Sequence, residues 1–124
     1  MATKPTETVN SATGNTTIEC NRGDRLTLKI VIDTTFNEND KLKFSIVEKK
    51  NYNKVLFQRT YTILEETDEF YITLSEDDTR FSDVISKPVT YWYEIEYNDG
   101  QTLIGYDENG AKEFILYPEA PVKE

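Results

Sequence analysis

The chain has 124 residues and a mass of 14.4 kDa, which suits one domain with a single core. Its net charge of −9 argues against nucleic-acid binding, because phosphate contacts need clustered Lys and Arg, and also against anionic membrane surfaces. Histidine is absent, which excludes Ser-His and Cys-His nucleophilic systems and histidine metal ligands.

The N-terminal residues 1–15 are rich in Thr, Ser and Asn and contain almost no apolar groups. Such a segment cannot offset the entropy of ordering by burial, so we expect a flexible polar arm that becomes ordered only against a partner. Thr3, Pro5 and Val9 are then the partner-binding candidates within the arm. The same stretch lacks the apolar region of a secretory signal, so we expect a protein made in the cytoplasm without a signal peptide.

The next part of the chain carries short segments in which apolar and polar residues alternate. This period of two is typical of half-buried strands. A short first strand is expected over residues 16–20, followed by a turn beginning at Asn21. The alternation predicts further strands over residues 26–32, 41–46, 54–64 and 70–74.

The segment from Ser75 to Phe81 breaks this alternation. Ser75 can cap a helical turn, and the acidic residues 76–78 suit the positive end of a helix dipole. We expect one short helical turn here, after which Phe81 returns to the core.

The clearest strand signal lies over residues 89–97, where Tyr91, Tyr93 and Ile95 alternate with polar residues and Trp92. Asn98-Asp99-Gly100 follows, and Asp-Gly supplies the left-handed conformations that a tight hairpin requires. We expect a returning strand over residues 101–106. A last strand over residues 112–117 ends before Pro118.

Together these segments predict an all-β fold, an antiparallel β-sandwich of seven or eight strands with one short helical turn. The sandwich domain is expected over residues 16–118, between the arm of residues 1–15 and a C-terminal tail of residues 119–124. Tyr91, Tyr93 and Ile95 are expected to point inward between two stacked sheets.

The sequence shows no convincing catalytic or metal-binding motif. Cys20 has no evident activator and is interpreted as a small core or edge residue. Residues 76–78 and 107–110 are rich in oxygen ligands but lack the spacing of a calcium loop, so capping and turn formation explain them. A glycosidase-like pair of carboxylates is an alternative without specificity, because 23 acidic residues make such pairs common. We therefore expect no enzyme activity and no cofactor.

Two motifs suggest binding. Arg22-Gly23-Asp24 spells an integrin-binding tripeptide, but a glycine turn leading into a strand is the stronger explanation. Trp92 and Tyr71 are expected on the outer faces of their strands, where an aromatic patch could hold a protein partner or a sugar. The alternative is that they form stabilising cross-strand pairs.

Three stretches occur in a familiar order: Asn21 to Ile30, Phe70 to Phe81, and Tyr91 to Thr102. They combine a Gly-Asp turn, a strand that runs into a helical turn, and an aromatic strand that ends in an Asp-Gly hairpin. This order resembles the small immunoglobulin-like β-sandwich domains of tailed-phage and prophage virion proteins, such as the N-terminal domain of baseplate upper proteins.

The resemblance implies a non-enzymatic virion structural protein, in the role of a capsid decoration or of a neck, tail or baseplate accessory. Its partners would be other virion subunits, including further copies of the chain itself, with no nucleic acid or membrane partner. It would be made in the cytoplasm of a bacterial host and reside in the virion. The alternative function is a carbohydrate-binding module that uses Trp92 and Tyr71 as a stacking platform.

Overall fold

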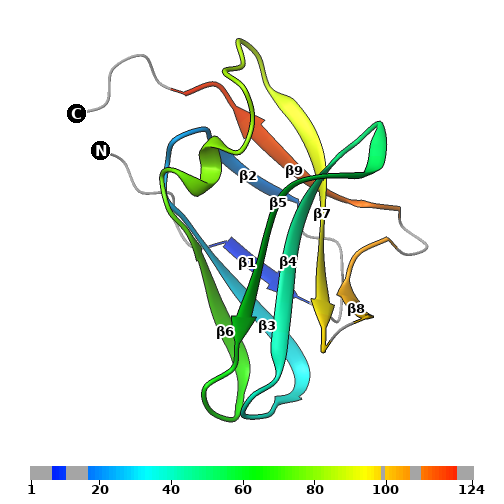
Figure 1. The fold of residues 1–124 in the computed structure, drawn as a ribbon. Coiled ribbons are helices and arrows are strands. Elements are labelled where there is room, and N and C mark those ends of the chain that lie inside the picture. The colour runs from blue at the N-terminus through cyan, green and yellow to red at the C-terminus, as the bar shows by residue number, and fades with distance from the viewer. Residues whose placement is uncertain (1–6, 11–16, 99, 107–109, 120–124) are drawn as a thin grey trace.

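The computed structural model describes residues 7–10, 17–98, 100–106 and 110–119, with the backbone alone for residues 7–10, 33, 34 and 52. Within this part the chain forms nine strands and one short 3-10 helix, η1 (Figure 1). In chain order these are β1 (Glu7–Asn10), β2 (Ile18–Asn21), β3 (Leu26–Phe36), β4 (Lys41–Glu48), β5 (Asn51–Thr62), β6 (Thr67–Leu74), η1 (Asp78–Arg80), β7 (Val89–Tyr97), β8 (Gln101–Ile104) and β9 (Lys112–Tyr117).

The strands form two sheets, and the expected all-β sandwich is confirmed. The smaller sheet has the order β1-β3-β6, and the larger has the order β2-β9-β7-β4-β5, with β8 paired to β7 as well. The strands β3 and β6 face the row β9-β7-β4-β5, which is the arrangement of an immunoglobulin-type sandwich. The strands β5 and β6 are therefore edge strands of different sheets.

The core lies between the sheets and follows the predicted alternation. Tyr93 and Ile95 on β7 are at most 1% exposed, and Tyr91 is 7% exposed. Phe44 on β4 packs against Tyr93 with ring centroids 5.9 Å apart, and on its other side against Phe57 at 6.2 Å. Aromatic pairs of this kind add about 0.5–1.5 kcal/mol each beyond the area they bury. The interior is thus stabilised largely by apolar packing, and Cys20 is buried in it as predicted.

Two pairings depart from a purely antiparallel sandwich. β2 runs parallel to β9, with Ile18 opposite Phe114, and β1 runs parallel to β3, with Val9 opposite Ile30. β1 lies inside the segment for which the sequence predicted a flexible arm and is the reason that nine strands occur instead of seven or eight. It is held by backbone hydrogen bonds along the edge of β3, which require no apolar side-chain pattern.

The aromatic hairpin forms as predicted, although its return strand β8 ends at Ile104 instead of residue 106. Asn98 and Gly100 have φ values of 46° and 119°, the left-handed backbone that the Asn-Asp-Gly turn permits. The side chain of Asn98 also accepts a hydrogen bond of 2.8 Å from the backbone N–H of Lys41. The strand β5 begins at Asn51, three residues before its predicted start.

Candidate functional site

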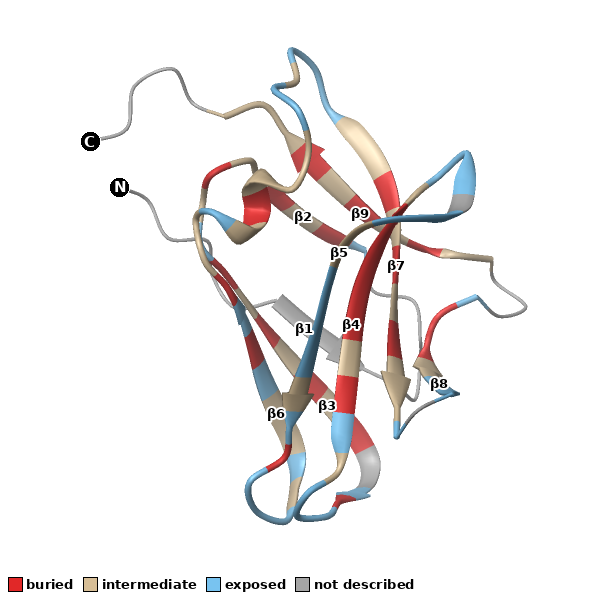
Figure 2. Cartoon of the chain, in the orientation of Figure 1, coloured by how far each residue is buried: buried red, intermediate tan, exposed pale blue. Residues whose placement is uncertain are grey.

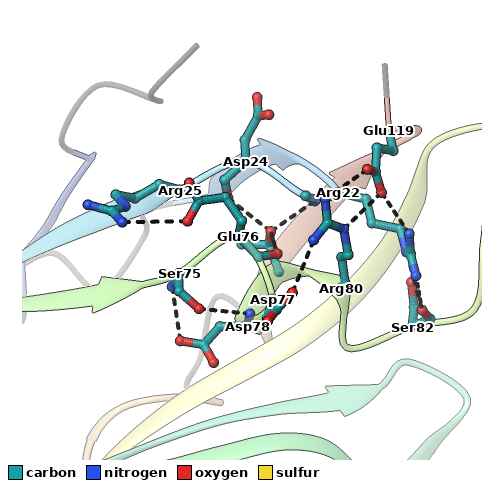
Figure 3. A network of polar contacts seen from close by, with 12 residues as sticks. Arg22, Asp24, Arg25, Ser75, Glu76, Asp77, Asp78, Arg80, Ser82 and Glu119 are labelled. Carbon is teal, nitrogen blue, oxygen red and sulfur yellow. Dashed lines mark hydrogen bonds and ion pairs between the residues drawn. The ribbon is translucent and has the colours of Figure 1, made fainter. Parts of the chain in front are cut away.

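Most of the long-range polar contacts among the described residues meet at one corner of the sandwich. We call it the polar corner: the turn of residues 21–25 between β2 and β3, residues 75–82 around η1, and Glu119 after β9 (Figure 3). These three segments are distant in sequence. The polar corner is therefore where the beginning, middle and end of the domain are joined.

A capping box begins the η1 segment, as the sequence predicted for Ser75. The Ser75 N–H donates to Oδ2 of Asp78 at 2.9 Å, and the Asp78 N–H donates to Oγ of Ser75 at 3.2 Å. Asp78 also accepts two hydrogen bonds from the guanidinium of Arg59 on β5, at 2.7 and 2.8 Å. These bonds favour the ionised carboxylate and lower the pKa of Asp78. Phe81 then returns to the core, with its ring 5.2 Å from that of Tyr91.

Thr79 is the centre of the polar corner. Its side chain is completely buried, and its hydroxyl accepts a 2.9 Å hydrogen bond from the N–H of Gly23. The same hydroxyl donates to the carbonyl of Asp24 at 2.9 Å. One side chain thereby satisfies a buried and a partly buried backbone group of a turn more than 50 residues away, which an apolar residue of the same shape could not do.

Two arginines close the polar corner around Glu119. Arg22 donates to Oε1 of Glu119 at 2.8 Å and to the carbonyl of Ser82 at 3.0 and 3.2 Å. Arg80 donates to Oε2 of Glu119 at 3.0 Å. The side chain of Arg22 is only 13% exposed, so the Arg22-Gly23-Asp24 tripeptide presents its arginine to the protein itself. Gly23 has a φ of 86°, in agreement with a structural turn.

The three arginines of the polar corner all form ion pairs with its carboxylates, and Asp78 pairs with Arg59 of β5. No three acidic or thiol side chains among the described residues are placed to hold a metal ion. A hollow of about 270 Å³ lies beside Phe81 and Tyr91, but its rim carries both Lys54 and the carboxylates of Glu48 and Asp83.

The predicted aromatic patch does not exist as one surface. Trp92 lies on β7 of the larger sheet, whereas Tyr71 lies on β6 of the smaller sheet. Tyr91 and Tyr93, the neighbours of Trp92, are buried, as is Ile72 beside Tyr71. Both aromatic residues therefore face outward, on opposite faces of the sandwich. The prediction of a combined stacking platform is therefore wrong. Alternation predicts which face of a strand a residue occupies, but not the sheet to which the strand belongs.

The other predicted partner residues belong to the N-terminal segment. Thr3 and Pro5 lie outside the described residues. Val9 belongs to β1, where it pairs in register with Ile30 of β3.

A surface that the sequence did not predict lies along β5 and β6. Both are edge strands on the same side of the sandwich, where Arg59 bonds to Asp78 and Tyr61 packs edge-to-face on Phe70 with centroids 6.3 Å apart. Within the described chain, neither strand is paired along its outer edge. Figure 2 shows that much of β5 is exposed. We call this surface, comprising β5, the turn of residues 63–66 and β6, the open side.

The open side also has an apolar hollow of about 270 Å³ where β5 turns into β6. Ile63, Leu64, Phe70 and Tyr71 contribute most of its lining. Leu64 is 79% exposed and Tyr71 is 50% exposed, which is high for large apolar side chains. Exposed apolar groups beside unpaired strand edges are characteristic of surfaces that bind other proteins.

Comparisons with known proteins returned no matching family model, curated protein or solved structure. None of the helical segments in the described ranges is long and apolar enough to cross a membrane.

Proposed function

We propose that this protein is a non-enzymatic structural subunit of a tailed-phage or prophage virion, which acts by docking onto other virion subunits as a capsid decoration or as a neck, tail or baseplate accessory. The open side is the observation that best supports a docking role. It combines two strand edges of twelve and eight residues with exposed apolar side chains. The polar corner, by contrast, joins distant segments of the chain and so holds the fold together.

Docking of this kind requires no chemical step. An exposed sheet edge can receive an extended segment from a partner, with affinity from backbone hydrogen bonds and specificity from alternate side chains. The pairing of β1 with β3 illustrates the principle inside this chain, since a polar four-residue strand is held at a sheet edge. An arm from a neighbouring subunit could be held in the same manner. The net charge of −9 would keep the free subunit soluble before assembly.

The assignment to a virion rests on the resemblance of three ordered motifs to phage sandwich domains. Two of the local elements behind these motifs are present: the Gly23 turn before β3 and the Ser75 capping box after β6. They support the proposal at the level of local structure.

The decisive experiment asks whether the protein belongs to particles. Virions purified on a density gradient from cells that carry the gene would be analysed by mass spectrometry, and tagged protein would be added to particles lacking it and sedimented. We expect the native chain in the particles and saturable co-sedimentation of the tagged chain. An unrelated β-sandwich of similar size and pI is the control. Absence from the particles together with co-sedimentation no greater than the control would refute the proposal.

A further inference from the structure

The two strands of the open side carry opposite charge in unbroken blocks. Residues 49–64, which include β5, contain four basic residues and no acidic one: Lys49, Lys50, Lys54 and Arg59. Residues 65–74, which include β6, contain four acidic residues and no basic one: Glu65, Glu66, Asp68 and Glu69. The basic block is exceptional in a chain with a net charge of −9.

The fold places these blocks on the two unpaired edges of one side. β5 is the edge of the larger sheet and β6 the edge of the smaller sheet, and only residues 63–66 separate them. Because so short a turn joins them, the two strands run in opposite directions. A basic edge and an acidic edge therefore lie next to each other in antiparallel orientation, one in each layer of the sandwich.

We propose that the open side is the interface of a homodimer, in which β5 of each copy pairs with β6 of the other. A two-fold axis parallel to the strands, between the two molecules, exchanges the layers, so that each β5 meets the partner copy's β6. The strands are then antiparallel, and each sheet continues into the opposite sheet of the second copy. A two-fold contact of this kind is closed and self-complementary.

Charge selects this arrangement over the simpler one. If β5 paired with β5 of the second copy, two basic blocks would face each other, which is destabilising for opposed strands. Pairing β5 with β6 instead places a basic block against an acidic block twice in each dimer. The existing surface pairs, Lys54 with Glu48 at 3.5 Å and Lys29 with Glu69 at 3.2 Å, are partly exposed and worth little, so they can be exchanged across the interface.

Apolar groups on the open side supply the second component of the interface. Among the described residues, five large apolar side chains are exposed, and Val55, Leu64 and Tyr71 belong to this side. They lie on β5, in the intervening turn and on β6 respectively. Burial of such groups gives affinity that salt does not weaken, whereas the charge blocks direct the register. The dimer does not depend on the virion proposal and concerns the free protein.

The proposal is tested by reversing charges on one edge at a time. One variant carries Lys50→Glu and Lys54→Glu on the β5 side, and another carries Glu66→Lys and Asp68→Lys on the β6 side; all four side chains are exposed. Association is measured by sedimentation velocity over a dilution series at low and high salt. Far-UV circular dichroism confirms that each variant is folded, and Lys87→Glu, on an exposed loop outside the open side, is the matched control.

We expect wild-type protein and the Lys87→Glu control to dimerise, less strongly at high salt. Each double variant alone should dissociate about tenfold more readily, since the net attraction between the basic and the acidic edge is then lost.

A wild-type protein that is monomeric at every concentration would overturn the proposal. Normal dimerisation of the Glu66→Lys, Asp68→Lys variant would also overturn it and would point to β5–β5 pairing. Particle binding is read out separately, so either proposal can fail while the other stands.

Discussion

Arginine and carboxylate side chains occur at both the polar corner and the open side, but their surroundings differ. At the polar corner, Arg22 and Arg80 share Glu119 and lie against segments from three parts of the chain. On the open side, Lys54 and Glu69 make single contacts longer than 3 Å and are partly exposed. Multiply bonded charges that join several segments hold a fold, whereas singly paired charges along an edge remain available to a partner.

Thr79→Val, at the polar corner, should cause the largest loss in the free energy of unfolding. Removal of the hydroxyl leaves the buried Gly23 N–H and Asp24 carbonyl without that partner, at an expected cost of up to about 3 kcal/mol in the free energy of unfolding. Urea denaturation followed by fluorescence measures the loss. Thr73→Val, at an exposed position on β6, is the control and should change stability little. Equal effects of the two substitutions would show that the polar corner does not stabilise the fold.

Gly23→Ala should have the next largest effect, about 2 kcal/mol, because alanine is strained in the left-handed region. The new methyl group would also lie 2.8 Å from the Glu119 carboxyl carbon and displace that side chain from its arginines. Gly110→Ala is the matched control, since Gly110 has a φ of 94° but no heavy atom within 4 Å of the new methyl position. If both substitutions cost the same in denaturation experiments, the contact with Glu119 contributes nothing.

A smaller effect is expected from the Arg59–Asp78 pair, and it should depend on pH. Hydrogen bonds from Arg59 lower the pKa of Asp78 below that of an unfolded aspartate, which is about 3.9. The pair therefore stabilises the native state fully above the unfolded pKa. This stabilisation is lost as the pH falls through the lower pKa of the native state. Arg59 is 44% exposed, which limits the effect to about 1 kcal/mol.

Denaturation of Asp78→Asn across the acid range tests this linkage. The variant should be less stable than wild type at neutral pH, and the difference should shrink below about pH 4. Asp83→Asn, in the exposed loop after η1, should follow the wild-type profile. A deficit of Asp78→Asn that does not change with pH would contradict the proposed role of the ionised pair.

The smallest effect should come from the apolar residues of the open side. Leu64→Ser removes a side chain that is 79% exposed, so the stability of the dilute monomer should change by less than about 0.5 kcal/mol. Leu42→Ser, at a completely buried position on β4, should be strongly destabilising by comparison. Calorimetry at low protein concentration checks both. A large loss for Leu64→Ser would mean that the open side is part of the core.

Much of the sandwich could be predicted from the sequence because burial between two sheets imposes a period of two. Tyr91, Tyr93 and Ile95 are predicted to point inward for this reason, and all three are buried. The Ser75 cap was predictable as well, since capping depends on residues only three positions apart.

The remaining features depend on contacts that leave no local pattern. β1 pairs through its backbone, which carries no side-chain signal. Thr79 is a polar residue in an acidic stretch, and its burial is explained only by the turn at Gly23. The change from basic to acidic residues after Leu64 is visible in the sequence, but its meaning requires knowing that both flanking strands are sheet edges.

Hydrogen–deuterium exchange, resolved to single backbone amides and measured at low and high protein concentration, tests this contrast most directly. The Gly23 and Arg80 amides should exchange slowly at both concentrations, because they are hydrogen-bonded within the polar corner. The β5 amides that do not face β4 should exchange rapidly in dilute protein and become protected in concentrated protein. Equal exchange of these β5 amides at both concentrations, while the protein remains folded, would contradict an open side that accepts a second copy.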